Sequence, residues 1–186
     1  MRVTVILFVL AIRSVVTKGG AGLPEPPPLR RGCALAVSPI STVETGLFLV
    51  CGSEKFRLYH PKNLYGNVRI ANRDEALHFA RLFTSRRTFF LVNLDGRVEL
   101  CASRCPASDT VLIRQPPEWF FDARVDESND PIEGKIFYIE RHVVGLDQSI
   151  RRVRERISEY GNYDLRSETV MATDAAQFGI VHIGDH

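Results

Sequence analysis

The stretch from Asn72 to Leu100 constrains the fold most, because a helix pattern is followed there by a hairpin pattern. Asn72 is a favourable N-cap residue, and Glu75, three residues later, completes a reciprocal capping pair. Apolar residues then recur at the spacing of one helix face, at Ala76, Phe79, Ala80 and Phe83. The run Thr88–Val92 and the turn pair Asp95-Gly96 predict an antiparallel hairpin. The sequence therefore predicts a helix that packs on an antiparallel sheet.

Further strands are predicted on both sides of this stretch. They cover Val43–Cys51, Lys55–Tyr59, Thr110–Arg114, Trp119–Val125 and Lys135–Val144. Asp126–Gly134 is acidic and rich in turn residues, so we expect a surface loop there. In Lys135–Val144, strict alternation places Glu140 and His142 on one face of the strand and Arg141 on the other.

The segment 146–160 fits two structures. Leu146, Ile150, Val153 and Ile157 have the spacing of a helix face. Two stretches of similar length, Ile150–Ser158 and Tyr163–Met171, could instead flank a turn and extend the sheet as a meander. The sequence leaves both interpretations open.

The fold class indicated by these patterns is α+β: an antiparallel sheet of about five to seven strands packed against one long helix. A cystatin-like architecture is compatible with this arrangement. No residue motif supports a named family. We expect a single globular domain over residues 33–186.

The amino terminus has the pattern of an export signal. Residues 1–22 combine Arg2, the apolar run Val3–Ile12 and small residues at their end, which indicates a signal peptide or an uncleaved membrane anchor. Residues 23–32 are proline-rich and are expected to form an extended linker. We therefore predict an extracytoplasmic protein, secreted or periplasmic, with membrane contact only through an uncleaved N-terminal segment.

The chain contains four cysteines, which is an even number compatible with two disulfides in an exported protein: Cys33, Cys51, Cys101 and Cys105. Three pairings are possible, and we favour Cys33–Cys51 with Cys101–Cys105, because the residues between the last two cysteines permit a turn. If residues 1–22 are not an export signal, we expect four reduced, buried thiols instead. A zinc site is disfavoured, since paired C-x-x-C spacing is absent.

An arginine cluster, Arg151–Arg156, is the clearest charged feature. Phosphate binding is one interpretation, and the favoured one is a solvated face whose charge is shared by Glu155 and Glu159. The net charge is +2, and residues 1–22 carry three basic residues and no acidic one, so their removal leaves −1. This nearly neutral balance disfavours a nucleic-acid partner.

Three other groups of residues could carry chemistry. Glu140 and His142 share a strand face and could act as an acid–base pair, although a surface pair is the simpler interpretation. His182, Asp185 and His186 offer metal-ligand atoms, but a chain end gives them no fixed geometry, and we predict no metal and no cofactor. Aromatic residues that could line a ligand groove are more simply core residues: Tyr59, Tyr65, Trp119, Phe120 and Phe121.

Three functional hypotheses follow. The leading one is an exported binding or interaction domain for an unknown protein or small-molecule ligand, because no catalytic motif is present. The second is a small hydrolase or isomerase with a pocket between helix and sheet, served by Glu140 and His142. The third is a nucleic-acid binder that uses Arg151–Arg156.

Overall fold

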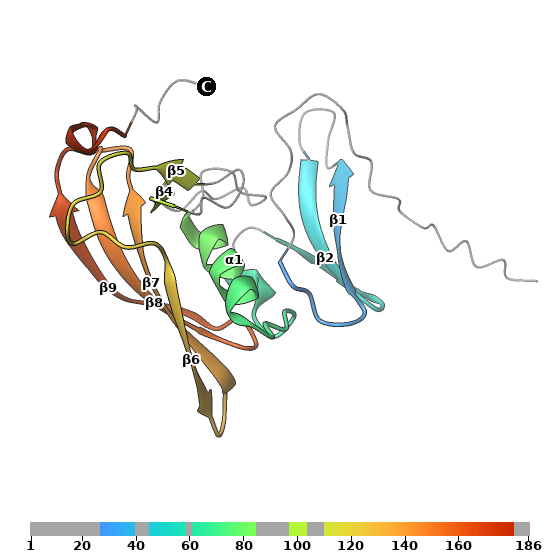
Figure 1. Cartoon of the computed structure of the whole chain (residues 1–186). Coiled ribbons are helices and arrows are strands. Elements are labelled where there is room, and N and C mark those ends of the chain that lie inside the picture. Colours follow the sequence, from blue (N-terminus) through green and yellow to red (C-terminus); the bar gives the residue numbers. More distant parts are fainter. Residues whose placement is uncertain (1–26, 40–44, 59–60, 85–96, 104–109, 181–186) are drawn as a thin grey trace, which may run out of the picture.

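A computed structural model describes residues 27–39, 45–58, 61–84, 97–103 and 110–180. These residues form two β-sheets and one α-helix, and the helix lies between the sheets (Figure 1). The elements are β1 (Cys33–Pro39), β2 (Thr45–Cys51), β3 (Glu54–Arg57), the 3₁₀ turn η1 (Pro61–Leu64), α1 (Arg73–Thr84), β4 (Val98–Cys101), β5 (Thr110–Leu112), β6 (Arg124–Asp130), β7 (Gly134–Val144), β8 (Ile150–Ser158), β9 (Tyr163–Ala172) and the 3₁₀ turn η2 (Ala176–Phe178). The fold is thus mixed, and strands predominate. No helix in the described ranges is long and apolar enough to cross a membrane.

The strands divide between a smaller sheet, β1-β2-β3, and a larger sheet with the order β5-β4-β7-β8-β9. Strand β6 pairs with β7 along the same edge as β4, farther along that edge, and the β4–β5 pair is parallel. The prediction of one antiparallel sheet of five to seven strands is therefore confirmed only in part. The described strands number nine, and the helix spans only twelve residues.

Two predictions around β6 are wrong. Asp126–Gly134 is not a loop, because most of it belongs to β6, which pairs residue by residue with β7 as far as Asp130↔Gly134. Both faces of an edge strand can be solvated, so its polar composition resembles that of a loop. Trp119–Val125 is not a strand either, since β6 begins only at Arg124. The predicted hairpin beyond residue 84 falls mostly outside the described residues.

The segment 146–160 contains strand β8 and no helix, and β7, β8 and β9 form a meander. The helix-like spacing arose because the apolar residues belong to two faces. Ile150 packs in a cluster with Val144, whereas Ile157 packs in the cluster under α1. At the β8–β9 turn, Gly161 has φ 82°, and a Cβ there would lie 2.4 Å from a methyl group of Val68. That position therefore requires glycine.

Helix α1 begins as the sequence predicts. The side-chain oxygen of Asn72 accepts a hydrogen bond from the backbone N–H of Glu75 at 2.9 Å. In return, the Glu75 carboxylate accepts from the backbone N–H of Ala71 at 2.7 Å and from the Asn72 amide at 3.1 Å. These bonds satisfy N–H groups that the helix itself cannot pair.

The main core lies between α1 and the larger sheet. Phe79 and Phe83 project from the helix onto Phe137, Ile139 and Ile157, all of which are buried. The Phe83 ring stacks on Tyr163 of β9, with ring centroids 3.8 Å apart. Apolar burial on this scale is the main stabilising term of the fold.

The smaller sheet joins the same core through Leu49 and Leu58, which are fully buried. Part of the expected linker also packs there. Leu29 forms a β-bridge with Val68, and the carbonyl of Pro28 accepts a hydrogen bond from Arg69 N–H. The last residues of the 23–32 segment thus lie against the domain. The signal peptide lies outside the described residues and stays a prediction.

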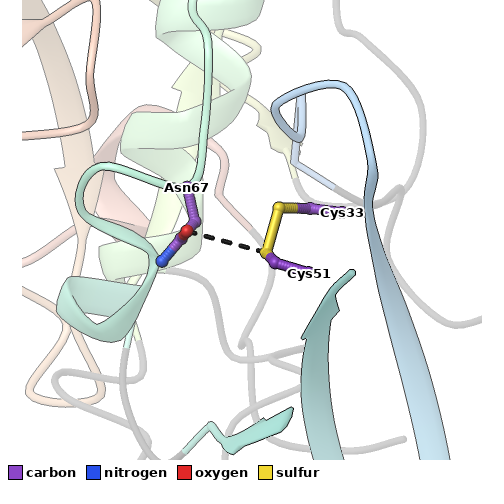
Figure 2. The surroundings of a disulfide bond; sticks show 3 residues. All are labelled: Cys33, Cys51 and Asn67. Atoms are coloured by element: carbon purple, nitrogen blue, oxygen red, sulfur yellow. Dashed lines mark hydrogen bonds between the residues drawn. A yellow bond between two sulfur atoms is a disulfide. The ribbon is translucent and has the colours of Figure 1, made fainter. Parts of the chain in front are cut away.

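Cys33 and Cys51 form a disulfide that links β1 and β2, as we predicted. Figure 2 shows the amide of Asn67 beside this bond, with Asn67 Oδ1 3.6 Å from Cys51 Sγ. The contact brings the loop before α1 against the bridged strands. Cys101 is also disulfide-bonded, but Cys105 lies outside the described residues, so the second predicted pairing remains a prediction.

A cluster of charged side chains is buried beside the apolar core. Arg141 of β7 is fully buried and donates to both oxygens of Glu155 on β8, at 2.7 and 2.8 Å. It also donates to Glu99 on β4 at 3.2 Å and to the carbonyl of Ala80 in α1 at 3.2 Å. Burial alone lowers the pKa of Arg141, but the attraction of Glu155 and Glu99 outweighs that effect and raises it. Arg141 is therefore charged and connects the helix to two strands.

The two acids are held from other sides as well. Glu99 accepts two hydrogen bonds from Arg81 of α1, at 2.7 and 2.9 Å, and the Tyr163 hydroxyl donates to Glu155 at 2.8 Å. Burial would raise the pKa of Glu99, but hydrogen bonds from Arg81 and the charge of Arg141 outweigh burial and lower it. Four charges of balanced sign are thus paired with one another, which buried charges require.

The substitution Arg141→Met should lower the free energy of unfolding by about 3–5 kcal/mol, because it leaves Glu155 buried without its counter-ion. Urea unfolding followed by circular dichroism measures this loss. The matched control is Arg154→Met, an exposed arginine on the neighbouring strand β8, which should cost less than about 1 kcal/mol. Equal effects of the two substitutions would contradict a stabilising role for the buried cluster.

The double substitution Cys33→Ser/Cys51→Ser should lower the free energy of unfolding by about 3 kcal/mol, because the bridge closes a loop with a sequence separation of 18. Non-reducing urea unfolding is the measurement. The single variant Cys33→Ser should lose about as much as the double variant, since either removes the whole bridge. A double variant with the wild-type midpoint would show that the bridge contributes nothing.

Candidate functional site

The face of the larger sheet opposite α1 carries a row of arginines. Side chains alternate along β7, so Phe137 and Ile139 face the helix. Tyr138, Glu140 and His142 face the other way. In the β7–β8 register each of these outward residues lies opposite an arginine: Tyr138 with Arg156, Glu140 with Arg154, and His142 with Arg152. Arg124 of β6 lies opposite Glu140 on its other side.

We define the arginine face as Arg124, Arg152 and Arg154 around Glu140. The Oε1 atom of Glu140 accepts a hydrogen bond from Arg154 Nε at 2.9 Å and lies 3.6 Å from Arg152 Nε. The Arg154 and Arg152 side chains are 55% and 31% exposed. Three arginines against one carboxylate give this part of the face a surplus of positive charge that solvent and ligands can reach.

Arg124 is held by an aromatic ring instead of an acid. Its guanidinium carbon lies 4.1 Å from the centre of the Phe121 ring. Such a cation–π contact fixes the side chain and leaves the planar donor groups available for hydrogen bonds. Arg156, farther along β8, is by contrast paired with Glu133 and is only 13% exposed.

His142 lies beneath the aromatic residues next to this face. Its ring is fully buried, and Trp119, Phe120 and Phe121 surround it with ring centroids 5.4, 5.1 and 4.6 Å away. Nδ1 is 3.3 Å from the carbonyl of Phe121, which indicates the tautomer that donates from Nδ1. No described residue is within hydrogen-bond distance of Nε2.

The pKa of His142 is lowered, mainly because burial disfavours the charged ring. The hydrogen bond to the Phe121 carbonyl works in the opposite direction, and the positive charge of Arg152 lowers the pKa further. His142 is therefore neutral near pH 7. A neutral, fully buried imidazole supports the position of the aromatic segment against β7.

The predicted arginine cluster divides between the two faces of the sheet. Arg151 lies on the helix side, where it donates to Glu168 at 2.9 Å and to Asp147 at 2.6 Å. Arg152, Arg154 and Arg156 lie on the opposite side. The favoured interpretation of a face that shares its charge with glutamates fits this arrangement, although the partners are Glu140, Glu133 and Glu168 and not the expected Glu155 and Glu159.

Glu140 and His142 share a strand face as predicted, but this face is opposite α1. The hypothetical pocket between helix and sheet would not contain them. That space holds the aromatic and aliphatic core together with the pairs of Arg141. Glu140 is bound to Arg154, and His142 is inaccessible to solvent.

The other candidate residues are scattered or lie outside the described residues. Trp119, Phe120 and Phe121 gather around His142, whereas Tyr65 is 60% exposed in the loop before α1. Tyr59 and the His182, Asp185, His186 group lie outside the described residues. Within the described ranges no three His, Cys, Asp or Glu side chains are arranged to hold a metal ion.

Sequence reasoning missed Arg124 and the buried acids Glu99 and Glu155. Arg124 fell in the predicted strand Trp119–Val125, but no local pattern indicated that this strand pairs with β7, and only that pairing places Arg124 opposite Glu140. The alternation of Lys135–Val144 offered one indication for the acids. It puts Arg141 on the face of Phe137 and Ile139, and an arginine on a buried face requires an acidic partner.

Acidification should destabilise the protein through His142. The folded-state pKa is lowered relative to the unfolded value of about 6.5. The unfolded chain therefore binds the proton first, and stability falls as the pH drops through about 6.5 towards the folded pKa. Urea midpoints between about pH 8 and 5 measure this slope. The variant His142→Leu should reduce the slope, and an unchanged slope in that variant would contradict the assignment to His142.

No protein-family model matches the sequence, and no curated protein and no solved structure is similar to the chain. The function of the arginine face is therefore inferred from its own chemistry.

Proposed function

We propose that this protein is an exported binding domain whose arginine face contacts an acidic segment of another polypeptide. The observation that carries the proposal is a group of three arginines on one face. Arg154 and Arg152 lie 2.9 and 3.6 Å from the Glu140 carboxylate, and Arg124 lies opposite Glu140 on β6. Arginine is enriched at protein interfaces because its planar fork binds carboxylates with two parallel hydrogen bonds. Ordered strands present all three residues on one face.

Export is supported by the Cys33–Cys51 disulfide, because such bonds persist in oxidising compartments. It is also supported by the leader pattern in residues 1–22. An extracytoplasmic protein would meet its partner outside the cytoplasm. The cystatin-like architecture is part of the same proposal: α1 crosses a largely antiparallel sheet, which leaves the part of the opposite face around Glu140 available for contacts.

An acidic polypeptide fits this face better than a nucleic acid does. Carboxylates are interleaved with the arginines at Glu140, Glu133 and Asp126, and they would repel a continuous polyanion. Arg151 faces the other side of the sheet, where Glu168 and Asp147 pair with it. The whole chain is also nearly neutral.

The enzyme alternative receives less support from the same residues. A general base needs access to the proton that it removes. His142 is fully buried, and the Glu140 carboxylate already accepts a hydrogen bond from Arg154. A binding role uses the exposed arginines directly and requires no such access.

The test is binding of a fluorescently labelled oligo-aspartate peptide, measured by anisotropy at low and high salt. We expect binding that weakens with salt, because the contact is between exposed charges. The double variant Arg152→Gln/Arg154→Gln should lose it. The matched control Arg97→Gln/Arg151→Gln removes the same charge from residues that pair with Glu168 on the helix side, and it should bind like wild type.

Two results would contradict this proposal. Equal losses in both double variants would mean that the peptide responds to net charge and not to the arginine face. Tighter, salt-sensitive binding of labelled oligothymidine than of oligo-aspartate would favour the nucleic-acid alternative. Thermal melts of all variants establish that each is folded at the assay temperature.

A further inference from the structure

The contacts of Glu140 with its arginines have a specific geometry. Its Oε1 atom meets both Arg154 and Arg152 through their Nε atoms, at 2.9 and 3.6 Å. A guanidinium carries five N–H donors, and four of them lie on the two terminal Nη groups. Among the described residues, none binds the Nη groups of Arg152 or Arg154. Glu140 therefore accepts a hydrogen bond from Arg154 Nε, forms an ion pair with Arg152 through Nε, and leaves the terminal Nη pair of each arginine available.

The terminal Nη pair is a good carboxylate-binding surface. Two parallel N–H groups match the two oxygens of a carboxylate, and this bidentate arrangement is stronger than a single contact. Arg154 is the more exposed of the two, and Arg152 lies beside it on the same face. Both terminal pairs can thus receive an incoming acid while Arg154 Nε remains hydrogen-bonded to Glu140 and Arg152 Nε remains in ion-pair contact with it.

The spacing of the two arginines defines what they would bind. Arg152 and Arg154 are alternate residues of β8, so their Cα atoms are about 6.6 Å apart along the strand. An extended polypeptide places its own alternate side chains on one face with the same repeat. Acidic residues at positions i and i+2 of such a segment would therefore meet both guanidiniums at once.

We propose that Arg152 and Arg154 form a paired carboxylate site for an extended segment with acidic residues at alternate positions, and that Glu140 is the positioning residue that orients both guanidiniums. This inference rests on the proposed function and names the partner motif for the same face. Arginine side chains have many rotamers, and ordering them on binding costs affinity. Holding them in advance through Nε reduces that cost, while the negative charge of Glu140 itself opposes an acidic ligand.

Two labelled peptides of equal composition test the spacing. One carries aspartates at alternate positions (Asp-Ser-Asp-Ser-Asp-Ser-Ser), and the other carries them at every third position (Asp-Ser-Ser-Asp-Ser-Ser-Asp), which turns successive acids to opposite faces of an extended chain. Wild type should bind the alternating peptide at least about fivefold more tightly, since only this peptide reaches both arginines. Equal affinities would overturn the motif. If wild type binds neither peptide and no oligo-aspartate, the proposed function itself fails.

Two variants of one residue test the positioning role. Glu140→Gln keeps an oxygen that accepts from Nε and removes the repelling charge, so it should bind the alternating peptide at least as tightly as wild type. Glu140→Ala removes both the accepting oxygen and the charge. Because its arginines are no longer oriented by residue 140, this variant should bind the alternating peptide about fivefold more weakly than wild type. If Glu140→Ala tightens binding as much as Glu140→Gln does, Glu140 only repels the ligand, and the positioning role is overturned while the arginine face stands.

Discussion

The fold depends on a fully buried arginine in β7, the longest of the described strands. Arg141 would be strongly destabilising alone, because burial removes it from water. Glu155 on β8, Glu99 on β4 and the Ala80 carbonyl in α1 all accept from it, so each surrounding element must be in place for the charge to be compensated. The apolar core supplies most of the stabilisation, and this network fixes how α1 is placed on the sheet.

The alternation of β7 and β8 separates two uses of charge. On the helix side, buried acids and arginines neutralise one another and leave nothing for a ligand. On the opposite side, exposed arginines outnumber the acid between them. A shift of one residue in the β7–β8 register would exchange these faces, so the core and the proposed binding face depend on the same pairing.

Particular elements show how far pattern reasoning reaches. The start of α1 and the faces of β7 were predictable, because capping and alternation depend on residues close in sequence. The β6 strand was not, since an edge strand with polar side chains differs from a loop only by its hydrogen bonds to β7. The strand at 146–160 stayed ambiguous because Ile150 and Ile157 belong to separate apolar clusters, which coincidentally gives helical spacing.

The sequence by itself determined the helix cap, the apolar stripe of α1, the alternation of Lys135–Val144 and the preferred Cys33–Cys51 pairing, because each is a local pattern or a composition. Only the tertiary structure decided which arginines share a surface. Arg124 and Arg154 are 30 positions apart in sequence and share a face because each lies opposite Glu140, on the two strands that flank β7, whereas the adjacent Arg151 and Arg152 lie on opposite sides of the sheet. Strand register is set by the burial of whole faces, and no short stretch of sequence contains that information.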